Sequence, residues 1–327
     1  MMPLVSVCLL CYNQRDWIAG AFAAAINQTY SNIELIVVDD QSTDGSSEIL
    51  QGCIAGYKNN GGKVPIVYCR NEMNLGNLRS TEKAYSLSKG ELLVKADGDD
   101  YSHVDRVQKI VNAWLANGKK DYVLTSDATS ISLDGEVLGY RNNQGKTLGA
   151  VGVYRRECYT LFDPVVYPDA HEDVVFFSRA LMLGTRCHVC ESLVDYRLGG
   201  GRSTGSHSYR QTMIRNMRRE EDAKRQFLLD VESLSHNING LGAEHWSAVG
   251  KKALSECHNN LLLWDGPSFI VRSQAFRAHH SHQLFTIAFA VQCLLLLPKC
   301  ISTPLVNTIY AINLFLRRGK KSADWRY

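Results

Sequence analysis

The first half of the chain alternates short apolar runs with helix-like stretches. The apolar runs lie at 4–10, 33–38, 66–69 and 92–96. Helical patterns lie at 17–27, 44–53, 78–88 and 105–116. Short, nearly all-apolar runs are typical of strands covered on both faces. Their alternation with helices predicts an α/β fold with a mostly parallel sheet and right-handed crossovers.

The second half predicts a few more strands and then helices. Strand patterns lie at 122–126 and 151–154, with a hairpin at 131–138 around Asp134-Gly135. Helical patterns lie at 174–183, 208–230 and 244–263. Two apolar runs, 284–297 and 304–316, come last, and the first is too short to cross a bilayer without tilt. We therefore divide the chain into an α/β domain at 1–205, a helical region at 206–280 and an apolar, basic segment at 281–327.

Charge separates the last segment from the rest. The net charge is +3, but from residue 270 onward eight Lys or Arg face one acid, Asp324, which leaves 28 basic and 32 acidic residues before it. Apolar runs with a basic margin at 317–321 favour anionic lipid over nucleic acid as the partner. We expect peripheral association with the cytoplasmic membrane. The alternative is that these helices pack onto the body or form a homo-oligomer.

Cysteine spacing and the N-terminus both point to the cytoplasm. The ten cysteines lack the even, close spacing of a disulfide framework, so reduced thiols are expected. The chain runs from Met1-Met2-Pro3 directly into a strand pattern, which is unlike a signal peptide.

The strand at 92–96 ends in an acidic stretch, Asp97-Gly98-Asp99-Asp100. Gly98 permits a tight bend that lets Asp97 and Asp99 converge, and two carboxylates suit Mg²⁺ or Mn²⁺. The alternative is an acidic turn that caps the next helix. Tyr12, Asp40 and Asn74 also follow strand ends, where ligands bind in parallel sheets, so one crevice is expected to collect them.

Two later motifs are also candidates for function. His171-Glu172-Asp173 stands at the start of an apolar helix, where acids act either as helix-dipole partners or in catalysis. The stretch at 196–205 is glycine-rich and basic, which suits either a mobile lid over a polyphosphate or a simple surface loop.

The order of these motifs resembles family 2 inverting glycosyltransferases, which have the nucleotide-diphospho-sugar transferase fold called GT-A. The motifs that carry this resemblance are Val5-Ser6-Val7 with Tyr12-Asn13, the run from Ile36 to Ser46, Asn74-Leu75-Gly76, Lys89-Gly90-Glu91, the run from Ala96 to Asp100, and His171-Glu172-Asp173. They span about residues 3–200. The resemblance implies a Rossmann-like, mostly parallel central sheet flanked by helices, with a C-terminal helical extension.

The same resemblance implies roles for individual residues. Those implied to contact the nucleotide-sugar donor are Leu10, Tyr12, Asp40, Asn74, Arg79, Asp97 and Arg202. Asp97 and Asp99 would hold the divalent metal, Mn²⁺ or Mg²⁺. Asp173, with Glu172 beside it, would be the general base.

The chain departs from the family at three positions. Thr81 and Glu82 stand where the family often has Arg-Asn, so Arg79 is expected to supply the positive charge of the missing arginine. Gly199 replaces a frequent histidine, and Arg202 is a better candidate than His207 for the phosphates.

Together these patterns predict an inverting transferase that moves a sugar from a nucleotide-diphosphate donor to an acceptor hydroxyl. A lipid-linked glycan of a bacterial surface polysaccharide, such as O-antigen or capsule, is the expected acceptor. The alternatives are a transferase of the same fold that acts on protein or teichoic acid, with an oligomerising C-terminus, and a non-catalytic nucleotide-sugar sensor.

Overall fold

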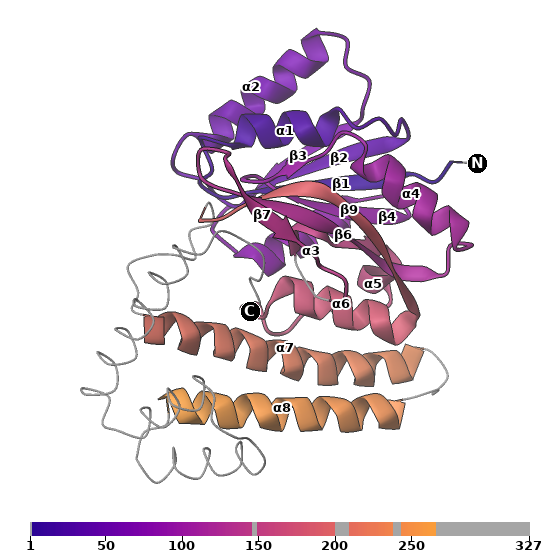
Figure 1. Cartoon of the computed structure of the whole chain (residues 1–327), viewed down its shortest axis with the longest axis vertical. Helices are drawn as coiled ribbons and strands as arrows, with labels where there is room; N and C mark the ends of the chain where they lie inside the picture. The colour runs from indigo at the N-terminus through magenta and orange to yellow at the C-terminus, as the bar shows by residue number, and fades with distance from the viewer. Residues whose placement is uncertain (1, 146–148, 200–208, 238–242, 266–327) are drawn as a thin grey trace. The chain divides into compact units, whose positions relative to one another are not determined.

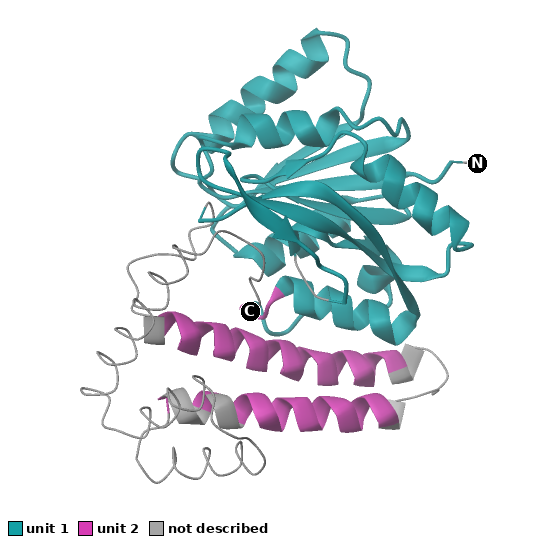
Figure 2. Ribbon diagram, in the orientation of Figure 1, with its two compact units in different colours: residues 1–168, 172–202, 323–327 teal, residues 169–171, 203–322 magenta. Residues whose placement is uncertain are grey.

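The computed structural model describes residues 2–145, 149–199, 209–237 and 243–265 (Figure 1). These residues form two compact units (Figure 2). The described part of the first unit is 2–145, 149–168 and 172–199, and that of the second is 169–171, 209–237 and 243–265. The apolar, basic segment at 281–327 and Arg202 lie outside the described residues.

The first unit is built on a nine-stranded sheet. Its strands are β1 (Val5–Cys11), β2 (Ile33–Asp39), β3 (Ile66–Arg70), β4 (Leu92–Asp97), β5 (Tyr101–Ser102), β6 (Asp121–Ile131), β7 (Val137–Arg141), β8 (Val153–Arg155) and β9 (Thr185–Arg197). The strand order is β3-β2-β1-β4-β8-β6-β9-β5, and β7 pairs with β6. Strands β1 to β4 are parallel, β8 is antiparallel to β4 and β6, and β6 and β9 are parallel. The mostly parallel sheet is therefore confirmed.

Helices cover both faces of this sheet (Figure 1). They are α1 (Ile18–Ile26), α2 (Ser46–Asn59), α3 (Asn77–Leu87), α4 (Arg106–Ala116), α5 (Glu157–Thr160) and α6 (Glu172–Leu183), with a 3-10 turn η1 at Gly149–Val151. Apolar side chains of α1, α2 and α4 share one core with the strands. Helices α3 and α6 meet on the opposite face, where the rings of Tyr85 and Phe176 lie 4.9 Å apart.

The alternation of strand β4 divides its side chains between these two faces. Leu92, Val94 and Ala96 point into the core of α1, α2 and α4. Successive side chains of a strand point to opposite faces, so Lys95 and Asp97 face the α3 and α6 side. The sheet therefore presents a lysine and a carboxylate to the start of α6.

Several predicted elements need correction. The sequence at 185–197 was not predicted as a strand, yet β9 occupies it and contains Tyr196 and Arg197, which were assigned to the glycine-rich loop. Its partner β6 extends to Ile131 rather than ending at Ser126, and α2 extends to Asn59. Strand β9 was missed because its charged and polar residues obscure the apolar alternation, while pairing with β6 along its length supplies the stability.

The second unit contains two long helices, α7 (Tyr209–Asn237) and α8 (Ala243–Asp265), which lie side by side. Their edge-to-face contact between Phe227 and Trp246 is part of this packing. Among the described residues, no helix is both long and apolar enough to cross a membrane.

Candidate active site

The acidic stretch begins at the last residue of β4 and lies beside the end of β1. Asp97 is the last residue of β4 and is paired in register with Leu10 of β1. Gly98 is required by close packing, because an added Cβ would lie 2.7 Å from Ile18 Cδ1 and 3.0 Å from the Leu10 carbonyl oxygen. The predicted tight bend is present, because the Asp100 N–H donates to the Asp97 carbonyl oxygen at 3.1 Å, and close packing adds a requirement for space.

Two of the three carboxylates of the stretch accept hydrogen bonds from distant segments. Gln14 Nε2 donates to Asp99 Oδ1 at 2.7 Å, and the Arg197 N–H donates to Asp100 Oδ1 at 2.7 Å. Burial and, as a smaller cause, the charge of Asp97 raise the pKa of Asp99 to about 6. Burial and the neighbouring carboxylates also raise the pKa of Asp100. The stretch concentrates negative charge that a cation would stabilise.

The alternative role as a helix cap is wrong for these carboxylates. Helix α4 begins at Arg106, and Asp105 occupies its N-cap position. Between the acidic stretch and that helix lies β5, whose residue Tyr101 pairs with Asp195 of β9.

Lys95 connects the acidic stretch to the second acidic cluster. Its ammonium group is buried and lies 2.6 and 2.7 Å from the two carboxylate oxygens of Asp97 and 3.6 Å from Glu172 Oε2. Burial by itself would lower the pKa of Lys95, but the charges of Asp97 and Glu172 outweigh this and raise it. Lys95 is thus a charged link between two motifs that lie far apart in the sequence.

Glu172 and Asp173 occupy the first turn of α6. The Glu172 carboxylate is buried, and burial raises its pKa to about 7. Its Oε2 accepts a hydrogen bond from Asn77 Nδ2 at 3.4 Å, whereas its Oε1 has no hydrogen-bond partner among the described residues. Asp173 is half-buried, and its Oδ1 accepts from the Val174 N–H at 2.9 Å, a contact that also fits a capping role.

A second group of predicted donor residues gathers around Asp40. Its carboxylate accepts hydrogen bonds from Asn71 Nδ2 at 2.7 Å and from the N–H groups of Leu75 and Gly76, both at 2.8 Å. These bonds hold the loop that carries Asn74, which is exposed. Asp40 therefore shapes this loop in addition to the contact with base and ribose that the resemblance implies.

Gln14 joins this edge of the sheet to the acidic stretch. The Tyr12 N–H donates to Gln14 Oε1 at 3.3 Å, while the amide nitrogen of Gln14 contacts Asp99. Tyr12 itself is 38% exposed, so its ring is accessible to a ligand. Arg79, in contrast, is paired with Glu82 on α3 at 2.8 Å, and its predicted phosphate contact stays a prediction.

Four residues of the site were not identified from the sequence as functional, namely Gln14, Asn77, Lys95 and Arg197. Lys95 had a usable signal, because a lone charge inside the apolar run at 92–96 must find a buried partner. Arg197 had none, because its contacts depend on the unpredicted strand β9.

The carboxylates fit a divalent metal only together with further ligands. Among the described residues, no three His, Cys, Asp or Glu side chains are grouped so that they could hold an ion by themselves. Asp97 and Asp99 nevertheless offer hard oxygen ligands, and Mg²⁺ is usually bound by one or two carboxylates plus substrate phosphates. The residues are thus compatible with an ion that binds together with a diphosphate.

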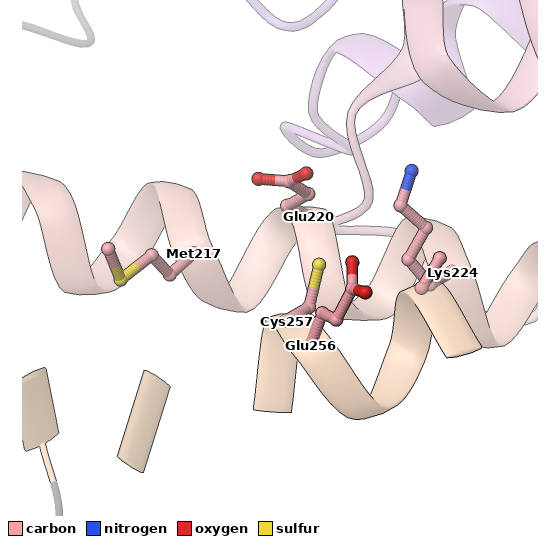
Figure 3. Close-up of a pocket in the computed structure, with 6 residues that line it drawn as sticks. Met217, Glu220, Lys224, Glu256 and Cys257 are labelled. Atoms are coloured by element: carbon pink, nitrogen blue, oxygen red, sulfur yellow. The ribbon is translucent and has the colours of Figure 1, made fainter. Parts of the chain in front are cut away.

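The second unit has a separate hollow of about 290 Å³ between α7 and α8 (Figure 3). It is lined by Met217, Glu220, Lys224, Ala253, Glu256 and Cys257. Burial raises the pKa of the Cys257 thiol to about 11, so this thiol is protonated at neutral pH. None of the residues of the acidic clusters contributes to it.

The comparison with protein families decides the assignment. The model of "Glycosyl transferase family 2" matches residues 6–167, which include the acidic stretch. The chain belongs to glycosyl transferase family 2. An uncharacterized glycosyltransferase of Haemophilus influenzae is 26% identical over an alignment of 270 residues, and the match covers 74% of this chain and 76% of the relative.

A relative with a named activity matches over a shorter stretch. It is the UDP-Glc:alpha-D-GlcNAc-diphosphoundecaprenol beta-1,3-glucosyltransferase WfaP of Escherichia coli, which is 35% identical over 104 residues. The match covers 31% of this chain and 37% of WfaP.

Solved structures share the fold of this glycosyltransferase. Staphylococcus aureus TarS 1-349 in complex with UDP aligns with a TM-score of 0.54 and 16% identity, covering 98% of this chain and 93% of that one. The mannosyltransferase PcManGT from Pyrobaculum calidifontis, in complex with GDP-Man and Mn²⁺, aligns with a TM-score of 0.53 and 15% identity, covering 98% and 89%. The fold is therefore GT-A, with a helical C-terminal part.

Proposed function

We propose that this glycosyltransferase is inverting and transfers a sugar from a nucleotide-diphosphate donor to an acceptor hydroxyl. The observation that carries the proposal is the convergence of two acidic clusters, in which Lys95 contacts both Asp97 and Glu172. Asp173 is next to Glu172 and half-buried. The acidic stretch suits binding of the leaving group, and the cluster at Glu172 and Asp173 suits removal of a proton.

The proposed reaction is a single displacement in which one proton passes from the acceptor hydroxyl to the enzyme. The acceptor oxygen forms a bond to the anomeric carbon from the face opposite the leaving group, and the bond from that carbon to the diphosphate oxygen breaks. Asp173 takes the proton of the acceptor hydroxyl as general base. The nucleoside diphosphate leaves as an anion, and one displacement inverts the configuration.

Asp97 and Asp99 would hold the divalent ion, which when bound stabilises the negative charge that develops on the diphosphate. The pKa of Asp99, raised by burial and by the charge of Asp97, favours this reading, because an ion relieves the repulsion among buried carboxylates. The neighbour PcManGT, solved with GDP-Man and Mn²⁺, supports the same choice of cofactor. Tyr12, Asp40 and Asn74 would form the nucleotide side of the site, with Leu10, Arg79 and Arg202 as further donor contacts.

A lipid-linked glycan is the proposed acceptor, and the cytoplasmic face of the membrane is the proposed place of reaction. Support comes from WfaP, whose name gives a diphosphoundecaprenol-linked sugar as its acceptor, and from the basic, apolar sequence at 281–327. We also propose that the α/β domain ends at residue 205 and the helical region at residue 280. Nucleic acid is not among the proposed partners.

The test is a thermal-shift screen of the full chain with UDP-, GDP- and dTDP-sugars, with and without Mn²⁺. A ligand that binds the native state raises its melting temperature, so the donor is expected to give the largest rise. Turnover of that donor with a diphosphoundecaprenol-linked sugar is then measured, together with the anomeric configuration of the product. Binding without transfer or hydrolysis would favour the sensor, and a retained configuration would exclude the inverting mechanism.

Membrane association is tested separately on vesicles. The full chain is expected to sediment with anionic vesicles and much less with neutral ones, because basic residues next to apolar runs favour anionic lipid. A chain without residues 284–327 is the comparison. If this deletion changes the oligomer size and leaves vesicle binding intact, the segment is an oligomerisation element.

A further inference from the structure

We infer that Lys95 is a positioning residue of the transfer reaction, which fixes the donor-side carboxylate of Asp97 relative to the start of α6. This inference rests on the proposed function, because it assigns Asp97 to the donor and Asp173 to the acceptor. The family comparison and the sequence motifs assign no role to Lys95.

The contacts of Lys95 are specific to the two clusters. Its side chain is 1% exposed, and the ammonium lies within hydrogen-bond distance of both oxygens of Asp97. Oε2 of Glu172, whose side chain is 3% exposed, lies 3.6 Å from the same ammonium group. A buried ammonium is stable only when paired, so Lys95 and both carboxylates constrain one another.

The neighbouring elements pack closely around the side chains of Lys95 and Glu172. An added Cβ at Gly149 would lie 3.0 Å from Glu172 Oε2 and 3.3 Å from Lys95 Nζ, so the η1 turn packs against the ion pair. Asn77 contacts the same oxygen of Glu172 from the start of α3. Strand β4, helix α3, helix α6 and the η1 turn therefore meet at Lys95 and Glu172.

The position of Lys95 between the two clusters also explains why its substitution would change kcat. Glu172 precedes Asp173 in the first turn of α6, so the position of Glu172 sets the position of the proposed base. Asp97 ends β4 and, under the proposed function, holds the ion on the donor side. A link between the two therefore fixes the distance between donor and base, and small misplacements of reacting groups cost large factors in rate.

The test is a double-mutant cycle with Lys95→Met and Glu172→Gln, read out by kcat, donor KM and thermal unfolding. Lys95→Met is expected to lower kcat of the folded enzyme roughly 10- to 100-fold, with a smaller change in donor KM. The double variant is expected to lose no more than the worse single variant, because both changes break one link.

Lys109→Met is the matched control. Lys109 also bridges two carboxylates, those of Asp105 and Glu191, at 2.8 and 2.6 Å, but it does so on the surface. Its substitution is expected to leave kcat and donor KM unchanged.

The outcomes separate this inference from the proposed function. If the wild type turns over a nucleotide sugar and folded Lys95→Met keeps its kcat, Lys95 has no positioning role. If the wild type turns over no nucleotide sugar, the proposed function fails, and the unfolding cycle decides whether the link exists. Additive losses of thermal stability for Lys95→Met and Glu172→Gln would refute the link, and non-additive losses would support it.

Discussion

The N–H group of Arg197 donates a hydrogen bond to Asp100 Oδ1 at 2.7 Å, although the two residues lie 97 positions apart. The Arg197 guanidinium continues the connection, donating to the Asp99 carbonyl at 2.9 Å and to the Ser132 and Leu133 carbonyls at 2.7 and 2.6 Å. The end of β9 thus secures the acidic stretch to the hairpin of β6 and β7.

Substitution of Arg197 is expected to loosen the acidic stretch. Arg197→Met removes the guanidinium contacts and should lower the free energy of unfolding by roughly 3 kcal/mol and raise the donor KM. Chemical denaturation and steady-state kinetics measure the two effects. Arg155→Met is the control, because Arg155 contacts the Lys119 carbonyl, and this variant should lose stability without a change in KM. An unchanged donor KM in Arg197→Met would contradict this role.

Asp173→Asn should abolish transfer while donor binding stays nearly intact. A general base contributes about 10²- to 10⁴-fold to the rate, and an amide cannot take its place. Calorimetric titration with the donor nucleotide and a transfer assay separate binding from turnover. Glu48→Gln removes an acid from the first turn of α2 and controls for loss of the helix-dipole interaction. Turnover close to wild type would remove Asp173 from its proposed role.

Asp99→Asn tests the metal site. Loss of one hard oxygen anion is expected to weaken Mn²⁺ binding in the presence of donor at least about tenfold. Titration followed by electron paramagnetic resonance measures the free ion. Asp105→Asn is the control, since Asp105 is paired with Lys109 on the surface. Equal Mn²⁺ affinity in Asp99→Asn and the control would exclude Asp99 as a ligand.

Gly98→Ala should destabilise the protein and lower its activity, because the added methyl group would press against Ile18 and the Leu10 carbonyl. Gly52→Ala is the matched control. Gly52 lies inside α2, and an added Cβ there meets no atom within 4 Å. That variant should gain up to about 1 kcal/mol from helix propensity. Equal melting temperatures for the two variants would show that the acidic stretch tolerates a side chain.

The raised pKa of Glu172 predicts a pH dependence of stability. Its folded pKa of about 7 lies above the ordinary 4.5, so the folded state binds this proton more tightly. The stabilisation is present in full below pH 4.5 and is lost as the pH rises to 7. Relative to Glu172→Gln, the wild type should lose up to about 3 kcal/mol across this range. Denaturation curves at several pH values measure the difference, and parallel pH profiles would contradict it.

The sequence predicted the elements in which pattern and burial agree. The apolar runs of β1, β2 and β4 are covered on both faces, so their composition alone revealed them. It did not predict β9, whose exposed and half-buried positions give no clear alternation. The acidic clusters were identified from residue type, but their connection through Lys95 required knowledge of which face of β4 each side chain occupies. Distances between segments far apart in sequence come only from the folded chain.

The position of Arg197 at the end of β9 has a consequence for synthesis. The parallel strands β1 to β4, and with them Asp97 to Asp100, leave the ribosome well before β9 is complete. A nascent chain that ends at Gly184 lacks every contact that Arg197 makes with the acidic stretch. The acidic stretch is therefore synthesised early, but its contacts with Arg197 form only when β9 joins β6.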